Sequence, residues 1–209
     1  MDLSRAARQA HSAWTLIGGH ALISHGVPRH TEDVDTLFLK HELLGVAEAL
    51  VANFGYVPLI YNIEHEGYVA TDEVTVHYMD DPVLFSVGEE RELVPLESPL
   101  GLIVELLAAQ HPIEREMIEA SALCRHYGVL VPIAPLGGVL LVKSIADRVK
   151  DVAAIEQTAE SLPREDLEQA LTWAAQRDPE NTKDLRAIIT NVRTRRIPKT
   201  TRSYRFPKR

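Results

Sequence analysis

Short apolar runs, each bounded by glycine or polar residues, follow one another through the N-terminal half of the chain. Runs of about four to eight such residues between turn signals predict strands. The predicted strands span residues 14–17, 34–39, 56–62, 68–71, 74–79 and 91–96. Two other stretches, 1–11 and 41–54, carry apolar residues at helical spacing, and Gly55 would end the second. This half of the chain therefore predicts a sheet with flanking helices.

Helical spacing prevails in the rest of the chain. Ser98-Pro99 has the form of a helix start, and the apolar positions from Leu100 to Leu107 predict a helix that ends before Pro112. The segment that follows, residues 113–124, fits either a strand or a helix. The remaining predictions are a short strand over 129–133, a helix over 136–155 and two helices after Ser161.

These patterns predict an α+β (α/β) protein with three parts. Residues 1–97 would form a mixed sheet with flanking helices, and residues 98–195 a mainly helical region. Residues 196–209, rich in Lys and Arg, would form a basic, flexible tail. A chain of 209 residues allows one large domain or two small ones. Its 45% hydrophobic and 25% charged residues are ordinary for a soluble globular protein.

The location of the protein follows from features that the sequence does not have. No apolar run approaches the ~18 residues that a membrane span requires, and residues 1–14 do not show the pattern of a signal peptide. Cys124 is the single cysteine, which excludes an internal disulfide framework. We therefore expect a cytoplasmic protein.

The net charge of −8 is distributed unevenly. Residues 183–209 hold ten Lys and Arg against one acid, so this segment is basic and the rest of the chain is strongly acidic. Within the tail, Tyr204 and Phe206 lie among basic residues. Such a segment either solubilises the end of the chain or contacts RNA through phosphate charge and base stacking.

The residues with the most chemical content lie between Trp14 and Lys40. Gly18-Gly19 forms the turn between a predicted strand and a short apolar helix, where the lack of Cβ atoms lets the backbone approach a ligand. The amides of the helix start would favour anionic oxygens such as phosphate. Asp33 and Asp35 are two residues apart on the next strand, so both carboxylates leave one face, roughly 6–7 Å apart at the backbone. Such a pair can hold divalent ions for phosphoryl transfer, and carboxylate oxygens suit Mg²⁺.

The order strand, Gly-Gly, short helix, R-x-T and Asp-x-Asp resembles the nucleotidyltransferase superfamily, whose mixed sheet is like that of the DNA polymerase β palm. The string RHTEDVD is close to that superfamily's R-x-T/S-x-D-[IV]-D wording. More narrowly, the chain resembles stand-alone prokaryotic nucleotidyltransferases related to abortive-infection type IV toxins. The resemblance implies a nucleotide site at Gly18, Gly19, Arg29 and Thr31. It also implies two Mg²⁺ ions, or Mn²⁺, bound by Asp33 and Asp35.

In the same family a third carboxylate usually lies on a later strand, in a V-x-V-D pattern. The matching strand here is VTVHYM, residues 74–79, and His77 stands where the acid is expected. His77 would serve as a neutral imidazole ligand or general base, since the ordinary imidazole pKa near ~6.5 suits either role. Alternatively, it is a polar residue of a half-exposed strand and the third acid is absent, or Asp80 takes its place in a shifted register.

A second pattern lies in the predicted helix 136–155. The string K-x-x-A-x-R-x-K-D, formed by Lys143, Arg148, Lys150 and Asp151, resembles the second motif of the type IV toxin-like enzymes. In that motif the leading Lys helps to bind the triphosphate, supported by the trailing basic–Asp pair. An amphipathic helix with a solvated charged face gives the same string without any ligand. The family often has an Asp three residues later, where this chain has Ala154.

Together with the resemblance, these residues predict a metal-dependent nucleotidyltransferase (EC 2.7.7-type) that moves an NMP group from an NTP to a hydroxyl of RNA, tRNA or protein. The resemblance also implies a toxin–antitoxin or defence setting, with a cognate antitoxin or a second copy of the chain as partner. His77 and Ala154 favour an alternative, a nucleotide-binding regulatory protein without catalysis. A hydrolase that uses Ser24 and His25 is disfavoured, because adjacent helical side chains diverge.

Overall fold

A computed structural model of the chain describes residues 2–80, 83 and 90–195. The predicted basic tail, residues 196–209, lies outside the described residues. In the described part, nine strands pair into one mixed sheet in the order β4-β3-β6-β7-β2-β1-β9-β8, with β5 paired to β6. The strands are β1 (Trp14–Leu16), β2 (Asp33–Leu39), β3 (Val57–Asn62), β4 (Gly67–Ala70), β5 (His77–Met79), β6 (Arg91–Glu97), β7 (Ile103–Ala109), β8 (Ala122–His126) and β9 (Val129–Ile133).

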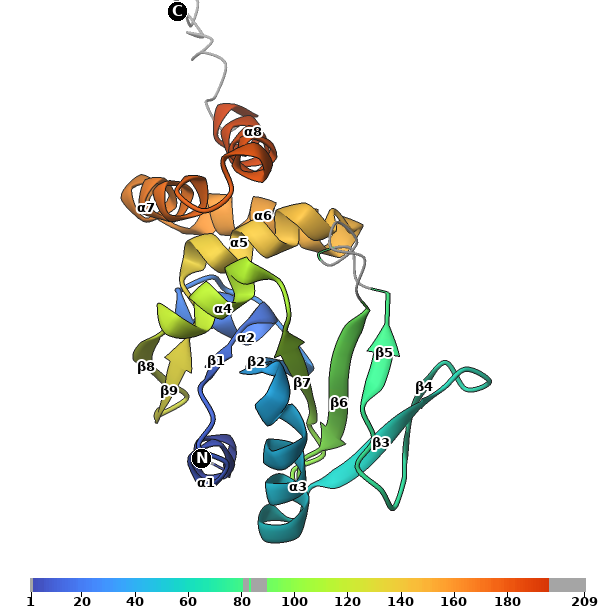
Figure 1. The fold of residues 1–209 in the computed structure, drawn as a ribbon. Helices are drawn as coiled ribbons and strands as arrows, with labels where there is room; N and C mark the ends of the chain where they lie inside the picture. Colours follow the sequence, from blue (N-terminus) through green and yellow to red (C-terminus); the bar gives the residue numbers. More distant parts are fainter. Residues whose placement is uncertain (1, 81–82, 84–89, 196–209) are drawn as a thin grey trace, which may run out of the picture.

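The helices gather at two ends of the sheet. In Figure 1, α5 to α8 lie together at one end and α1 and α3 at the other, while the β3–β4 hairpin projects to the side. None of the helices in the described ranges is long and apolar enough to cross a membrane. The predicted α+β class is confirmed. The helical segments are α1 (Asp2–Gln9), α2 (Gly18–Ser24), the 3-10 turn η1 (Lys40–Glu42), α3 (Leu43–Phe54), α4 (Pro112–Glu119), α5 (Leu136–Ala146), α6 (Val149–Ser161), α7 (Arg164–Ala175) and α8 (Pro179–Arg195).

Strand β2 lies in the middle of the sheet, between β1 and β7. Its residues from Thr36 to Phe38 are buried, and Phe38 stacks on Trp14 with ring centroids 5.9 Å apart. The residues at its start are only half-buried. This gradient anchors the apolar end of β2 in the core and leaves Asp33 and Asp35 half-buried at the other end.

The predicted helix over Leu100–Leu107 is wrong, since these residues form a turn and most of strand β7. The N–H of Gly101 donates to the carbonyl of Ser98 at 2.9 Å, and Gly101 has φ 76°. β7 then pairs antiparallel with β6 and parallel with β2. The near-continuous apolar run of a strand that is covered on both faces also fits one face of a helix, so the pattern alone does not separate the two.

The predicted helix over 136–155 is two helices. Asp147 adopts the left-handed conformation with φ 48° and ends α5, and α6 begins after Arg148.

The ambiguous segment 113–124 contains both predicted forms, since α4 is followed by β8. Because β7, β8 and β9 all join the sheet, the boundary predicted after residue 97 falls within the β6–β7 hairpin, and the helical part begins at Leu136.

Close packing fixes α5 relative to the sheet. A Cβ on Gly137 would lie 2.4 Å from the carbonyl oxygen of Ala170 in α7, and one on Gly138 would lie 2.5 Å from the side chain of Met117 in α4. Helix α4 is in turn tied to β6 by a buried ion pair, in which Arg91 donates to both carboxylate oxygens of Glu114 at 2.9 and 2.6 Å. The helical end of the molecule is therefore held in a defined position over the sheet.

Candidate active site

The turn at Gly18-Gly19 brings two side chains against the backbone. Gly18 has φ 60°, and a Cβ there would lie 1.8 Å from Oδ2 of Asp35. A Cβ on Gly19 would lie 2.5 Å from Oγ1 of Thr31. Real side chains do not approach this closely, so both positions require glycine. The sequence pattern assigns this space to a ligand, whereas the structure fills it with Asp35 and Thr31.

The acid pair at the start of β2 lies beside this turn. Asp33 and Asp35 alternate with Val34 along the strand, so both carboxylates leave one face of the sheet. Thr31 Oγ1 donates a hydrogen bond to Oδ1 of Asp33 at 2.7 Å. The glycine turn and the acid pair thus form one site, in which Asp35 lies against Gly18 and Thr31 connects the turn to Asp33.

A third carboxylate, Glu105 of β7, lies beside Asp35. The parallel register pairs Asp35 with Glu105, so the two side chains leave the same face of neighbouring strands, about 4.8 Å apart at the backbone. The hydroxyl of Tyr68, from the β3–β4 hairpin, donates to Oε1 of Glu105 at 2.8 Å. The sequence pattern misses Glu105 because it predicts a helix there. The sequence does contain a signal for a turn before Glu105. Ser98, Pro99 and Gly101 are residues that favour positions one, two and four of a type I turn.

Burial and, after it, the neighbouring carboxylates raise the pKa of Asp35. Burial, together with the charges of Asp33 and Glu105, raises the pKa of Asp35 to about 7, although Lys143 and Lys150 act in the opposite direction. An unperturbed aspartate titrates near ~3.9. Burial and the neighbouring carboxylates thus disfavour the charged form of Asp35 more than the lysines favour it, and a bound cation would stabilise the carboxylate form.

The second motif reaches the acid pair from the helical end. Lys143 of α5 and Lys150 of α6 lie close enough to Asp35 to lower its pKa. Asp151 is fully buried and accepts hydrogen bonds from Nζ of Lys143 at 2.7 Å and from Nε of Arg148 at 2.5 Å. Burial alone would raise the pKa of Asp151, but these hydrogen bonds and charges lower it. Asp151 therefore stays ionised and holds Lys143 and Arg148 in place.

Arg29 lies in the segment that leads from α2 to the acid pair. Its Nε and Nη1 are buried, and within the described part of the chain they have no hydrogen-bond partner. The carbonyl of the preceding Pro28 accepts a hydrogen bond from Gln157 of α6, and Thr31 follows two residues later against Gly19. A guanidinium with unpaired buried N–H groups favours anionic oxygens, and it binds phosphate well.

Two predicted positions do not join this site. His77 lies on β5, which is separated from β2 by β6 and β7, and its Nε2 lies 3.2 Å from the carbonyl oxygen of Leu59. Asp80 follows β5 and is exposed. Ala154, where the family often has an acid, is a residue of α6 that is 3% exposed and packs in the core. The structure therefore brings Glu105, and neither His77 nor Asp80, next to Asp35.

Asp33 and Asp35 suit Mg²⁺ as two ligands of a coordination shell that water and substrate would complete. Among the residues that the structure describes, no three or more His, Cys, Asp and Glu side chains are grouped so that they could hold a metal by themselves. Mg²⁺, however, usually takes one or two carboxylates and completes its shell with water and substrate phosphates. Asp33 and Asp35 can supply those carboxylates, and the charges of Asp33 and Glu105 beside Asp35 favour a cation there.

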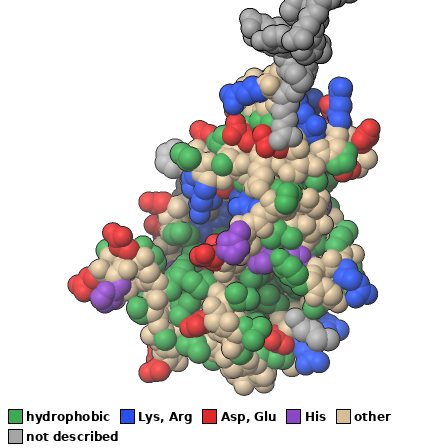
Figure 2. All heavy atoms as spheres, turned by 180° about the vertical axis from the view of Figure 1, so that it is seen from behind, with side chains coloured by type: hydrophobic (Ala, Val, Ile, Leu, Met, Phe, Trp, Pro, Cys, Tyr) green, Lys and Arg blue, Asp and Glu red, His purple; other side chains and the backbone are tan. Residues whose placement is uncertain are grey.

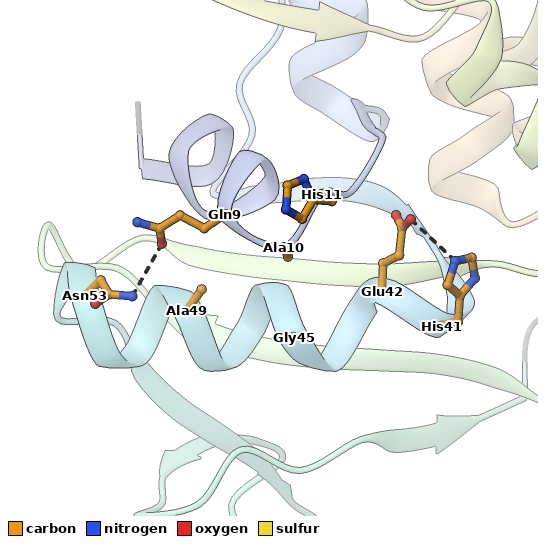
Figure 3. Close-up of a pocket in the computed structure, with 8 residues that line it drawn as sticks. All are labelled: Gln9, Ala10, His11, His41, Glu42, Gly45, Ala49 and Asn53. Carbon is orange, nitrogen blue, oxygen red and sulfur yellow. Dashed lines mark hydrogen bonds and ion pairs between the residues drawn. The ribbon is translucent and has the colours of Figure 1, made fainter.

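Two hollows of the molecule lie elsewhere. One, of about 500 Å³, lies between α1 and α3, where Asn53 donates to Gln9 (Figure 3). The other, of about 460 Å³, is lined by parts of α2, α5 and α7, among them Ser24 and Trp173. Neither hollow is lined by a predicted site residue. Between the helical end and the sheet, Figure 2 shows Lys or Arg side chains in a recess that acidic and histidine side chains border.

The chain is similar to nucleotidyltransferases of solved structure. ANT(2'')-Ia in complex with adenylyl-2''-tobramycin gives a TM-score of 0.45 at 13% identity, over 93% of this chain and 94% of that one. The solution structure of the same antibiotic-resistance factor gives 0.42 at 14%, over 93% and 89% of the two chains. A nucleotidyltransferase-like protein from Paracoccidioides brasiliensis gives 0.41 at 16%, over 88% and 89%. No protein-family model and no curated protein matches the sequence. Comparisons at this level of identity do not establish the function. The function is therefore inferred from the residues of the site.

Proposed function

We propose that the protein is a metal-dependent nucleotidyltransferase, which moves an NMP group from an NTP to a hydroxyl of RNA or protein. One observation carries the proposal: Oδ2 of Asp35 occupies the space left open by Gly18, so the glycine turn and the acid pair form a single site. Glu105, Lys143 and Lys150 adjoin that site. A site that combines carboxylates for a cation with lysines for phosphates suits phosphoryl chemistry.

The carboxylates would bind the cation. Asp33 and Asp35 would hold Mg²⁺, which when bound neutralises charge on the α-phosphate and orients it. Glu105 would supply the third carboxylate of this face, which the family pattern places at the position of His77. The hydrogen bond from Tyr68 fixes Oε1 of Glu105 and leaves Oε2 for water.

Basic residues would bind the rest of the triphosphate. Lys143 is held by Asp151, so its ammonium group is oriented before the nucleotide arrives. Lys150 and Arg29 add positive charge, and Arg29 brings buried nitrogens that lack a protein partner in the described ranges. These groups would stabilise the negative charge that develops on pyrophosphate as it leaves.

A transfer assay tests the proposal directly. Wild-type protein is incubated with α-³²P-labelled NTPs, Mg²⁺ and either bulk tRNA or cell lysate, and label in RNA or protein is measured. Asp35→Asn should lower the rate by about 10²–10³, as the loss of a group that stabilises the transition state does. The matched control is Asp72→Asn, the same change at an exposed aspartate that is not part of the site, and it should leave the transfer rate unchanged.

The outcomes separate the proposal from its alternative. No transfer by the wild type, or transfer that Asp35→Asn leaves undiminished, contradicts the enzyme. Thermal stabilisation by ATP and Mg²⁺ without any turnover instead supports a nucleotide-binding regulatory protein of the same fold.

A further inference from the structure

Three side chains beside the proposed site are connected to one another, and we refer to Ser24, His126 and His20 as the relay. His20 and Ser24 lie one turn apart on α2, and His126 is the last residue of β8. Nδ1 of His126 lies 2.7 Å from Oγ of Ser24, and Nε2 of His126 lies 3.0 Å from Nδ1 of His20. The transfer described above gives none of these three residues a role.

The hydrogen bonds of the relay determine where its protons lie. Oγ of Ser24 lies 3.0 Å from the carbonyl oxygen of His20 and donates to it, since a carbonyl only accepts. The hydroxyl has one hydrogen, so His126 donates from Nδ1 to Ser24. A neutral His126 then accepts at Nε2 from the Nδ1–H of His20. His20 is therefore left with its lone pair on Nε2, the nitrogen that can take a proton.

Both imidazoles are held in the neutral form. Burial and the neighbouring His126 lower the pKa of His20 from 6.5, and Asp33 of β2 opposes this shift only in part. Burial also lowers the pKa of His126, whose ring lies 4.4 Å from that of Tyr127 between centroids. At pH 7 both rings are therefore uncharged, as the hydrogen-bond directions require.

His20 directly follows the glycine turn in α2, where Gly19 packs against Thr31 and Thr31 donates to Asp33. The charge of Asp33 acts on His20, whereas Lys143 and Lys150 act on Asp35. In an in-line transfer the attacking hydroxyl and the departing pyrophosphate lie on opposite sides of the α-phosphorus. With the lysines on the pyrophosphate side, His20, on the side of Asp33, would be left to the acceptor.

We propose that His20 is the general base of the transfer and that Ser24 and His126 are positioning residues that hold its tautomer. This inference rests on the proposed nucleotidyl transfer, and it requires an acceptor that carries an ionisable O–H. The acceptor oxygen forms the bond to the α-phosphorus while its proton passes to Nε2 of His20. The bond from the α-phosphorus to the bridging oxygen breaks, and pyrophosphate leaves with that electron pair. His20 then returns the proton to solvent.

The tautomer can be measured without any activity. In protein labelled with ¹⁵N-histidine, two-bond ¹H–¹⁵N spectra at pH 7 distinguish protonated from unprotonated ring nitrogens, and His→Gln variants assign each ring. We expect a protonated Nδ1 and a bare Nε2 in both His20 and His126. Ser24→Ala should allow the opposite tautomer in both rings. A protonated Nε2 on His20 in the wild type overturns the proposal.

The kinetic test measures kcat with the acceptor that the transfer assay identifies. His20→Gln should lower kcat by about 10²–10⁴ while the thermal shift with ATP and Mg²⁺ stays at the wild-type value. The wild-type rate should fall on the acid side as His20 and Asp35 gain protons, and in the variant only the part due to Asp35, whose pKa is about 7, should remain. Free imidazole should restore part of the rate to His20→Ala. His65→Gln, an exposed histidine of the β3–β4 turn, is the control.

Each outcome has a distinct meaning. A wild-type rate and pH profile in His20→Gln overturns this inference and leaves the nucleotidyltransferase intact, whereas no transfer by the wild type defeats both. Should His20→Gln fail to fold, Ser24→Ala keeps the imidazole in place. It should then show a smaller loss of kcat, up to about tenfold, because only the tautomer is affected; an unchanged kcat and pH profile in that variant overturns the proposal.

Discussion

A methyl group added at Gly18 would lie 1.8 Å from Oδ2 of Asp35, at a residue with φ 60°. Gly18→Ala should therefore lower the free energy of unfolding by roughly 1–3 kcal/mol and displace the carboxylate. Urea unfolding at pH 7 measures the first effect, and the Mg²⁺-dependent shift in Tm measures the second. The control is Gly45→Ala in α3, where an exposed site has no neighbour within 4 Å. That change should stabilise the protein by up to about 1 kcal/mol. Equal stability of Gly18→Ala and wild type would contradict the contact.

Asp151 holds two cations from a buried position, so its loss leaves both without their partner. Asp151→Asn should lower the free energy of unfolding by roughly 1–3 kcal/mol at pH 7. Because Lys143 would no longer be oriented, the same change should weaken NTP binding. Calorimetric titration with ATP and Mg²⁺ measures this second effect. Binding as tight as that of the wild type would show that Lys143 does not depend on Asp151.

The pH dependence of this contribution has a defined sign. The folded protein lowers the pKa of Asp151 below its ordinary 3.8, so the stabilisation is complete above that value and is lost as the pH falls through the lower folded pKa. The difference in unfolding free energy between wild type and Asp151→Asn should be constant from about pH 5 to about pH 7 and shrink below about pH 4. Urea unfolding at a series of pH values measures it. A difference that grows on acidification would contradict the ion pairs.

At the scale of elements, the junction of α5 and α6 depends on Asp147 in a left-handed conformation, with φ 48°. Glycine adopts this conformation without a steric penalty and is the residue that most often ends helices in this way. Asp147→Gly should therefore raise the free energy of unfolding by about 0.5–1 kcal/mol, which thermal unfolding detects as a higher Tm. Asp147→Ala is the control and should not stabilise. A lower Tm for the glycine variant would mean that the aspartate side chain itself supports the junction.

Local patterns predict the first elements well because their signals are contiguous. The apolar strand at Trp14, the glycine turn, the short helix and the strand of the acid pair all appear in the predicted order. Strand β7 does not, since its apolar run fits a helix as well as a doubly covered strand. The break at Asp147 is also hidden, because one residue in a left-handed conformation leaves little trace in an apolar pattern.

The same distinction separates the parts of the candidate site. Asp33, Asp35 and Lys143 belong to short motifs, so the sequence marks them as candidates. Glu105 and His126 become neighbours of those motifs only through strand pairing between distant segments, β2 with β7 and β1 with β9. No local spacing encodes these pairings. The third carboxylate and the relay therefore become visible only in three dimensions.

At the scale of the whole molecule, the proposed nucleotide would connect two parts of the fold. Asp33 and Asp35 extend from the sheet, whereas Lys143 and Lys150 approach from α5 and α6. The packed glycines of α5 already fix the helical end over the sheet, so the site is formed before the ligand binds. A ligand that contacts both parts should slow the opening of each, since either opening would break its contacts.

ATP and Mg²⁺ should therefore raise Tm and slow amide hydrogen exchange in both parts at once. Ligand at ~100 times its dissociation constant adds about 2.7 kcal/mol to the free energy of unfolding. Exchange measured by mass spectrometry should show added protection in peptides that cover residues 18–35 and in those that cover residues 143–151. Peptides around the hollow between α1 and α3 (Figure 3) should not change. Asp35→Asn should abolish the Mg²⁺-dependent protection in both segments, because the cation is the link between sheet and triphosphate. Protection confined to the helices, or centred on the α1–α3 hollow, would contradict a nucleotide site between the sheet and α5–α6.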